Sequence, residues 1–162
     1  MEKILIVDDS LLQATQLRGI LDDKYDVTIA QTAEEGLSRA SSEDYSLILL
    51  DVVMPGMDGF TLLKKLQEEI ATQSIPVILI TSLSGVEDEQ KGLLLGAVDY
   101  ITKPFNAVIV RARVSTHIKL YKYRQQAERQ SMTDQLTGIA NRRRYERYSA
   151  VKWCEAGRMK VP

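Results

Sequence analysis

Three short runs of the chain contain only large apolar residues, so neither face of such a segment suits exposure to water. These runs lie at residues 4–7, 47–50 and 77–80. Strands with one solvated face alternate apolar and polar residues, whereas strands of a parallel sheet are covered by helices on both faces. The three runs therefore predict inner strands of a parallel β-sheet.

The rest of residues 1–120 continues the same alternation. Two further apolar runs occur at 27–30 and 98–101, and stretches of helical length with one apolar face separate all five runs. Strands that alternate with helices in this way build parallel sheets. The sequence predicts an α/β fold with a doubly wound, five-stranded parallel sheet.

The starts of three helices carry a capping signature, which pairs Ser10 with Gln13, Thr32 with Glu35, and Ser84 with Glu87. In a capping box the first side chain accepts the N–H of the residue three positions on, whose own side chain reaches back to the N–H of the cap. The sequence thus predicts helices that begin just after each of these caps.

A helix longer than the others is predicted at residues 105–131. No Gly interrupts this stretch, and the only proline at its edge, Pro104, precedes it. One stripe has the spacing of a heptad repeat: Val114, Ile118, Tyr121, Gln125, Glu128 and Met132. We expect an extended C-terminal helix and a homodimer that forms through this helix, through the surface of the α/β part, or through both. An ordinary surface helix is the alternative.

Composition excludes several classes of protein. The single cysteine excludes an internal disulfide framework and a multi-cysteine zinc site. The single histidine argues against a His-based metal site or a Ser-His-Asp triad. No apolar run has the length of a membrane span, and the N-terminus lacks the pattern of a signal peptide. We therefore expect a cytoplasmic protein with no membrane association.

The net charge of −1 is unevenly distributed. Residues 1–120 carry a charge of −7, and residues 121–162 carry +6. Such a split indicates that the chain is not one uniform unit. The basic run at 142–144 fits a solvated helix face, because no helix-turn-helix pattern follows it, and we expect no nucleic-acid partner.

Polar residues follow four of the apolar runs, and they are Asp8, Asp9, Asp51, Thr81 and Lys103. The carboxyl ends of parallel strands meet at one edge of the sheet, where ligands bind. Three carboxylates in one place need a compensating charge, and oxygen ligands suit Mg²⁺. A divalent cation beside a lysine is a usual arrangement for a phosphoryl group, and a carboxylate can itself become an acyl phosphate. Solvated caps at strand ends are the alternative interpretation.

Four segments together resemble the receiver domain of two-component response regulators. They read ILIVDDS, ILLDVVMPGMDGF, VILITS and GAVDYITKPF, and the resemblance covers residues 1–120. It implies a flavodoxin-like strand order of 2-1-3-4-5 and a histidine kinase as phosphodonor. Gly56 and Gly59 in the second segment permit a tight turn and the entry into a helix.

The resemblance also implies a role for each candidate residue. Asp51 corresponds to the phosphoacceptor aspartate. Asp8 and Asp9 correspond to the acidic pair that positions Mg²⁺, with the backbone carbonyl of Val53 as a further ligand.

The same resemblance implies a switch. Thr81 corresponds to the hydroxyl that turns toward the phosphoryl group, and Tyr100 to the rotating aromatic residue. Lys103 corresponds to the lysine that pairs with a phosphoryl oxygen, and the Lys103–Pro104 peptide bond is expected to be cis.

The C-terminal segment SMTDQLTGIANRRRYERY resembles the opening of GGDEF-type diguanylate cyclase domains. The matching residues are Asp134, Leu136, Thr137, Gly138, Asn141, Arg142 and Arg143. We expect a helical linker at 121–133 and a truncated start of a GGDEF domain at 134–162 that does not fold independently. The catalytic residues of that family have no counterpart here, so we expect no cyclase activity from this chain.

Together these features predict a signalling protein that is not itself an enzyme. Phosphorylation of Asp51 would change its surface or oligomeric state and, in a longer protein, control a diguanylate cyclase. A dimerisation module that works without phosphorylation is the alternative. A phosphatase of the haloacid-dehalogenase type would need an aspartate where Val53 stands, and a dinucleotide-binding enzyme would need a glycine-rich turn where Asp8 and Asp9 stand.

Overall fold

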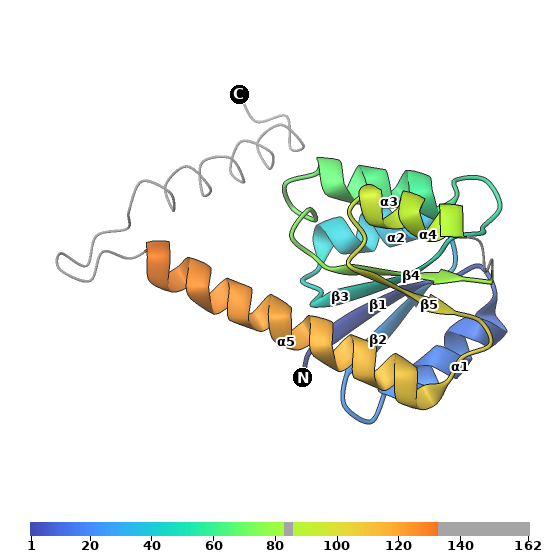
Figure 1. The fold of residues 1–162 in the computed structure, drawn as a ribbon, viewed down its shortest axis with the longest axis horizontal. Coiled ribbons are helices and arrows are strands. Elements are labelled where there is room, and N and C mark those ends of the chain that lie inside the picture. The colour runs from blue at the N-terminus through green and yellow to red at the C-terminus, as the bar shows by residue number, and fades with distance from the viewer. Residues whose placement is uncertain (83–85, 133–162) are drawn as a thin grey trace. The chain divides into compact units, whose positions relative to one another are not determined.

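The computed structural model describes residues 1–82 and 86–132 (Figure 1). Strands and helices alternate throughout this part of the chain. In order they are β1 Lys3–Val7, α1 Leu11–Leu21, β2 Asp26–Ala30, α2 Ala33–Ser42, β3 Leu47–Asp51, α3 Gly59–Glu68, β4 Val77–Thr81, α4 Val86–Leu94, β5 Asp99–Thr102 and α5 Ala107–Met132. The predicted GGDEF start at 134–162, with its basic run, lies outside the described residues, as do residue 133 of the predicted linker and the predicted helix cap at Ser84.

The five strands form one parallel sheet in the order β2-β1-β3-β4-β5, which confirms the predicted topology. The predicted apolar runs are the strands to within one residue. Asp51 and Thr81 close β3 and β4. The chain moves from β1 to β2 on one side and to β3 on the other, so the strand order reverses between β1 and β3. In sheets of this kind ligands bind beyond the strand ends at such a point.

Helices cover both faces of the sheet, as the apolar runs require. Figure 1 shows α1 and the first part of α5 on one face, and α2, α3 and α4 on the other. The sheet residues divide accordingly: Leu5, Ile48 and Leu50 pack in one buried cluster, and Ile4 and Leu49 in the other. The alternation of side chains along each strand places consecutive residues in opposite cores.

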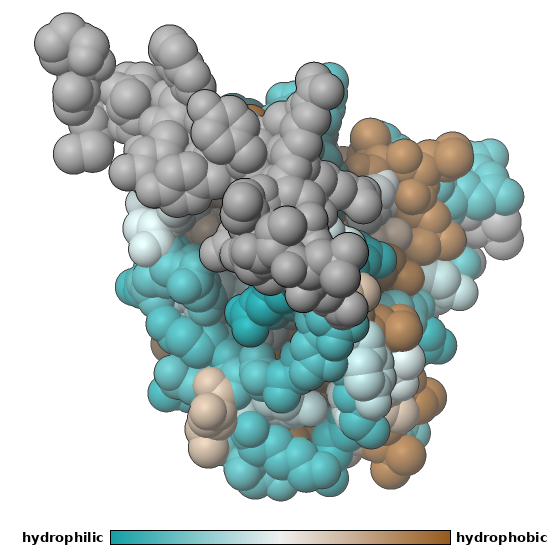
Figure 2. Space-filling view, turned by 90° about the vertical axis from the view of Figure 1, so that its left-hand side faces the viewer, coloured by the Kyte–Doolittle hydropathy of each residue, from teal (hydrophilic) through white to brown (hydrophobic). Residues whose placement is uncertain are grey.

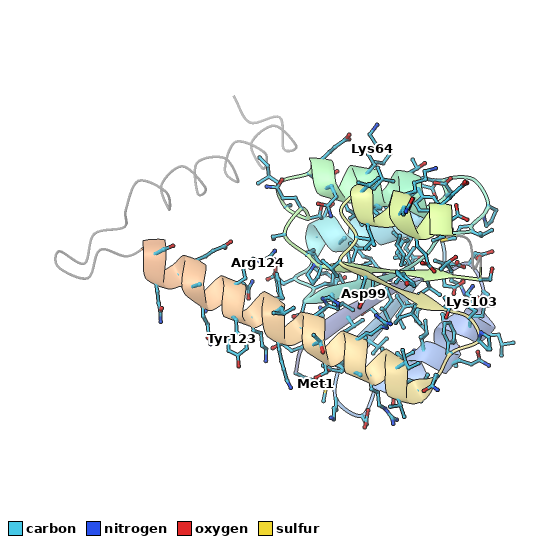
Figure 3. The ribbon with its side chains drawn as sticks, in the orientation of Figure 1. Met1, Lys64, Asp99, Lys103, Tyr123 and Arg124 are labelled. Atoms are coloured by element: carbon cyan, nitrogen blue, oxygen red, sulfur yellow. The ribbon has the colours of Figure 1, made fainter. Side chains whose placement is uncertain are left out.

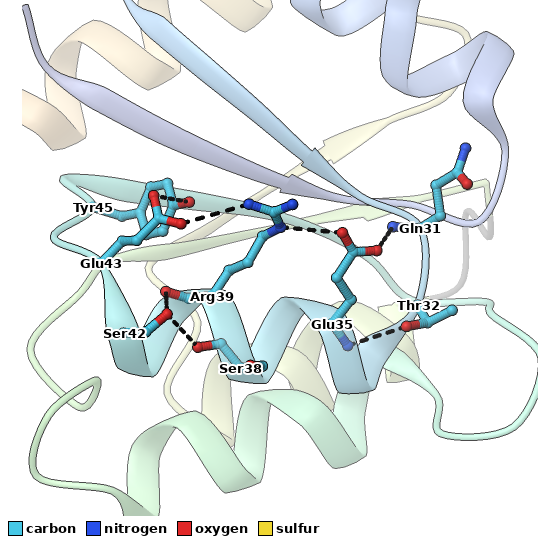
Figure 4. A network of polar contacts seen from close by, with 8 residues as sticks. All are labelled: Gln31, Thr32, Glu35, Ser38, Arg39, Ser42, Glu43 and Tyr45. Atoms are coloured by element: carbon cyan, nitrogen blue, oxygen red, sulfur yellow. Dashed lines mark hydrogen bonds and ion pairs between the residues drawn. The ribbon is translucent and has the colours of Figure 1, made fainter.

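Side chains cap the helices as predicted at α1 and α2. Ser10 Oγ accepts the N–H of Gln13 at 3.4 Å, and Thr32 Oγ1 accepts the N–H of Glu35 at 3.1 Å. The return contact of a capping box is not made as predicted. Glu35 accepts the N–H of Gln31, one residue before the cap (Figure 4), and Gln13 turns to another partner described below.

Helix α2 carries a surface network that ties it to the start of β3 (Figure 4). Arg39 contacts Glu35 at 3.1 Å and Glu43 at 3.5 Å, and Glu43 accepts the Tyr45 hydroxyl at 3.0 Å. The ion pairs are partly exposed, so water screens them and each contributes little to the stability of the fold. Their effect is to fix the direction in which the chain leaves α2, rather than to stabilise the fold strongly.

The long helix predicted near residues 105–131 is present as α5, which has 26 residues. Val114 and Ile118, the first members of the heptad stripe, are buried with Val110 in the core of the sheet. These heptad positions therefore pack in the hydrophobic core of the chain itself. Among the described residues, no helix is both long enough and apolar enough to cross a membrane.

The loop after β3 depends on two glycines. Gly56 has a φ of 77°, a backbone conformation that residues with a side chain rarely adopt. Gly59 donates its N–H to the carbonyl of Val52 at 2.9 Å, and a Cβ at this position would lie 2.2 Å from the backbone oxygen of Asp51. The sequence prediction for both glycines is confirmed, and Gly59 brings α3 directly against the end of β3.

We expect Gly59→Ala to lower the free energy of unfolding by about 1 to 3 kcal/mol, because the methyl group would collide with the backbone rather than with a movable side chain. Urea unfolding followed by circular dichroism measures the change. Gly19→Ala in α1 is the matched control, since nothing lies within 4 Å of the position that its methyl group would take, and it should stabilise the fold by up to about 1 kcal/mol. Equal unfolding midpoints for the Gly59 variant and wild type would contradict this role.

Candidate functional site

Three carboxylates gather where β1 and β3 end. Asp8 and Asp9 follow β1 directly, and Asp51 is the last residue of β3. Each offers an oxygen, and these oxygens lie within 4.8 Å of one another. Asp8 and Asp51 are buried, whereas Asp9 is exposed. The sheet thus brings together the acidic residues singled out in the sequence.

Asp8 is the most constrained of the three. Its Oδ1 accepts the N–H of Ser10 at 2.9 Å, and its Oδ2 is the one buried side-chain oxygen of the described residues without a hydrogen-bond partner. Burial raises the pKa of Asp8 to about 6, and the negative charge of Asp51 contributes in the same direction. An anionic oxygen left unpaired inside a protein is costly, and a bound cation would relieve that cost.

Lys103 supplies the opposite charge. It follows β5, and Figure 3 shows it at the end of the sheet toward which the strand arrows point. Its Nζ lies 3.3 Å from Asp51 Oδ2 and donates to Gln13 Oε1 at 2.5 Å. The Lys103–Pro104 peptide bond is cis, as predicted. The contact with Gln13 does not follow from the sequence, because the capping pattern assigns that side chain to the helix start.

Thr81 stands between these groups in the sheet, as the last residue of β4, with 3% of its surface exposed. Its backbone carbonyl accepts the N–H of Lys103 at 2.9 Å, which fixes the loop that carries the lysine. Val53 lies in the loop after β3, and its N–H donates to Asp51 Oδ1 at 3.2 Å. The role of the Val53 carbonyl as a metal ligand stays a prediction.

Tyr100, in β5, lies beside a polar cluster that the sequence did not reveal. Asp99 accepts Arg113 Nη1 at 2.8 Å and lies 3.0 Å from His117 Nε2, both on α5. Burial alone would raise the pKa of Asp99, and the hydrogen bonds from Arg113 and His117 bring that pKa below its ordinary value. These charged contacts thereby hold the first residue of β5 against α5.

The Tyr100 ring connects this cluster to α4. The guanidinium of Arg113 lies 5.9 Å from the centre of the ring. A hydrogen bond with Glu89 raises the pKa of the Tyr100 phenol. Tyr100 therefore contacts a residue of α4 and one of α5. The spacing of residues in the sequence could not have predicted these contacts, because the residues come from three different elements.

The chain belongs to the response regulator receiver domain family, which it matches over residues 4–115. The matched segment holds every candidate site residue and, apart from Lys3 at the start of β1, all five strands of the described sheet. It also shares its fold with solved receivers. A CheY-like receiver domain protein from Methanospirillum hungatei superposes with a TM-score of 0.71 and 30% identity, covering 76% of this chain and 98% of that one.

Longer curated proteins contain similar segments. Response regulator PleD of Caulobacter vibrioides is 43% identical over 113 residues, which cover 69% of this chain and 25% of PleD. The transcriptional regulatory protein CiaR of Streptococcus pneumoniae is 40% identical over 119 residues, covering 74% of this chain and 52% of CiaR. The chain therefore spans about a quarter to a half of these relatives, and the shared part is the receiver.

Asp8→Asn should stabilise the fold in magnesium-free solution. The ordinary pKa of the carboxyl is 3.8 and the folded value is about 6, so folding favours the protonated acid. The stability that Asp8 contributes is therefore greatest below pH 4 and is lost as the pH rises to about 6. The neutral variant has no such loss, so above pH 6 it should exceed wild type by about 1 to 3 kcal/mol.

Chemical unfolding at intervals between pH 4 and pH 8 measures this difference. Asp23→Asn, at an exposed turn, is the matched control and should change stability by less than about 0.5 kcal/mol at every pH. A difference between the Asp8 variant and wild type that does not grow between pH 4 and pH 6 would contradict the assignment of the proton to Asp8.

Proposed function

We propose that this chain is a phosphorylation-dependent response regulator that accepts a phosphoryl group on Asp51 from a histidine kinase. The observation that carries the proposal is the position of the Asp51 carboxylate. It lies at a strand end between the acidic pair and the ammonium of Lys103. A nucleophile, an acidic cation site and a fixed positive charge are the parts that phosphoryl transfer requires.

The chemistry follows from these groups. A carboxylate oxygen of Asp51 attacks the phosphorus atom, and the bond between phosphorus and the donor's nitrogen breaks. The product is an acyl phosphate on Asp51 and a histidine that regains its proton from solvent. Lys103 donates a hydrogen bond to a phosphoryl oxygen and offsets part of its charge.

Asp8, Asp9 and Asp51, with the backbone carbonyl of Val53, would hold Mg²⁺. Their donors are all oxygen atoms, which this cation prefers, and the unpartnered Oδ2 of Asp8 supports a cation at this point. When bound, Mg²⁺ neutralises the negative charge that the phosphoryl group brings into the acidic cluster.

The switch proceeds through Thr81 and Tyr100. The acyl phosphate offers new acceptor oxygens to the Thr81 hydroxyl, and movement of Thr81 opens space for the Tyr100 ring. Tyr100 now contacts Glu89 and Arg113, so an inward rotation would release contacts on both α4 and α5. A local electrostatic change would thereby alter an exposed surface.

In a longer protein this surface would control a diguanylate cyclase. The resemblance of residues 131–157 to the opening of a GGDEF domain supports this output. A relative from Vibrio cholerae that bears the name probable cyclic di-GMP phosphodiesterase is 38% identical over 116 residues, which cover 26% of it. A similar receiver thus occurs in a protein named for this second messenger.

Asp51→Asn should abolish magnesium-dependent phosphorylation without loss of the fold, because the amide keeps the shape of the side chain but cannot act as the nucleophile. Phosphoramidate serves as the donor, and intact mass spectrometry counts the phosphate added. Asp58→Asn, which alters an exposed N-cap of α3, is the matched control and should be phosphorylated at the wild-type rate. Equal phosphate on wild type and the Asp51 variant would refute the assignment.

We also propose that the activated chain forms a homodimer. Several apolar side chains of α4, of α5 and of the segment just before β5 are exposed: Leu93, Leu94, Val98, Val108 and Ile109. Figure 2 shows apolar residues gathered along one side of the molecule in that view. Neighbouring exposed apolar side chains mark interaction surfaces.

Beryllium fluoride with Mg²⁺, which mimics the phosphoryl group, should therefore raise the mass measured by light scattering to that of two chains. Leu94 is 88% exposed, so Leu94→Lys should leave the fold intact and weaken association about tenfold. Lys64→Glu, at an exposed position of α3, is the control and should not change the mass. A monomer at high concentration with and without beryllium fluoride would exclude the dimer.

A further inference from the structure

The ammonium of Lys103 lies closer to the neutral side-chain amide of Gln13 than to the carboxylate of Asp51. Its Nζ donates to Gln13 Oε1 at 2.5 Å, while the distance to Asp51 Oδ2 is 3.3 Å. Gln13 comes from the first turn of α1 and is half-buried, and the Lys103 side chain is only 17% exposed. The shorter hydrogen bond of this lysine is thus outside the acidic cluster.

The sheet order explains why such a partner is needed. Lys103 follows β5, and β4 stands between β5 and β3, which ends in Asp51. The lysine must therefore extend across the end of a whole strand. A free lysine side chain loses about 2 kcal/mol of rotamer entropy when it is held in one such conformation. A second contact beyond Asp51 can hold it extended before any ligand binds.

Hydrogen bonds through Ser10 connect Gln13 to the acidic cluster. Its backbone N–H donates to Ser10 Oγ at 3.4 Å, and the N–H of Ser10 donates to Asp8 Oδ1 at 2.9 Å. The amide oxygen of Gln13 then accepts the ammonium that reaches Asp51. A series of contacts therefore runs from Asp8 through α1 and Lys103 to Asp51.

The chemical type of the residue suits this position. An ammonium has three protons, and Gln13 and Asp51 occupy two directions, which leaves one for an oxygen of an incoming phosphoryl group. A glutamate would add a fourth anion to a site that already holds three carboxylates. A neutral acceptor orients the lysine without repelling an anionic substrate.

We propose that Gln13 is a positioning residue that holds Lys103 extended for the phosphoryl group; this inference rests on the proposed phosphorylation of Asp51. Gln13 acts through the lysine and does not take part in the chemistry. Its removal lets the ammonium leave the geometry that the transition state requires, and misplaced catalytic groups lower rates steeply.

Gln13→Met keeps the length of the side chain and removes the acceptor. With phosphoramidate and saturating Mg²⁺, the phosphorylation rate constant should fall about 3- to 10-fold. Gln16→Met, one turn along α1 at an exposed position, is the matched control and should keep the wild-type rate. Magnesium affinity should be equal in all three proteins, because Gln13 does not contact the carboxylates.

A double-mutant cycle separates positioning from a merely structural effect. In a Lys103→Met background, Gln13→Met should cause no further fall in rate, because the group it positions is already gone. An equal fall in both backgrounds would show that Gln13 acts through the stability or shape of α1, and would overturn the proposal. So would an unchanged rate for Gln13→Met in the presence of Lys103.

The contact can also be observed without phosphorylation. In ¹⁵N-labelled wild type at low temperature, the hydrogen-bonded ammonium of Lys103 should exchange slowly enough to give a proton–nitrogen cross-peak, and Gln13→Met should remove it. A cross-peak that survives the substitution would contradict the contact. If the contact is present but wild type accepts no phosphate at Asp51, the proposed function fails, and the positioning role fails with it.

Discussion

The buried negative charge at the end of β1 is the constraint on which the site depends. Asp8 is buried with one oxygen unpartnered, and Asp51 lies against it. The parallel sheet makes this juxtaposition unavoidable, because neighbouring strands end at the same edge. Such a cluster is costly until positive charge reaches it, so a cation that bound there would recover part of this free energy.

The sequence predicted the sheet well because the evidence for it is local. Residues 47–50 have no polar position, and only a strand covered on both faces suits such a run. The convergence of Asp8, Asp51 and Lys103 then followed from topology alone. The direction of Gln13 did not follow, because the pattern Ser10-to-Gln13 signals a helix cap equally well whether the glutamine bonds the cap or a lysine 90 residues away.

The periodicity of the sequence could not predict contacts between separate helices and strands. Asp99 contacts Arg113 and His117 because β5 and α5 pack together, and no spacing within either element indicates the pairing. The result is that β5 has two functions. It carries Lys103 at its end toward Asp51, and it carries Asp99 and Tyr100 against α5 and α4. A displacement of this strand reaches the site and the outer surface together.

The position of β5 has a consequence for how the protein is made. Asp8, Asp9 and Asp51 all lie in the first half of the chain, whereas Lys103 comes after β5, which pairs with β4 at the edge of the sheet. The three carboxylates therefore emerge from the ribosome well before the lysine that lies 3.3 Å from Asp51. Until β5 has docked on β4, this positive charge cannot reach the acidic cluster. The proposed phosphorylation of Asp51 would thus depend on a strand that is made late in the described part of the chain.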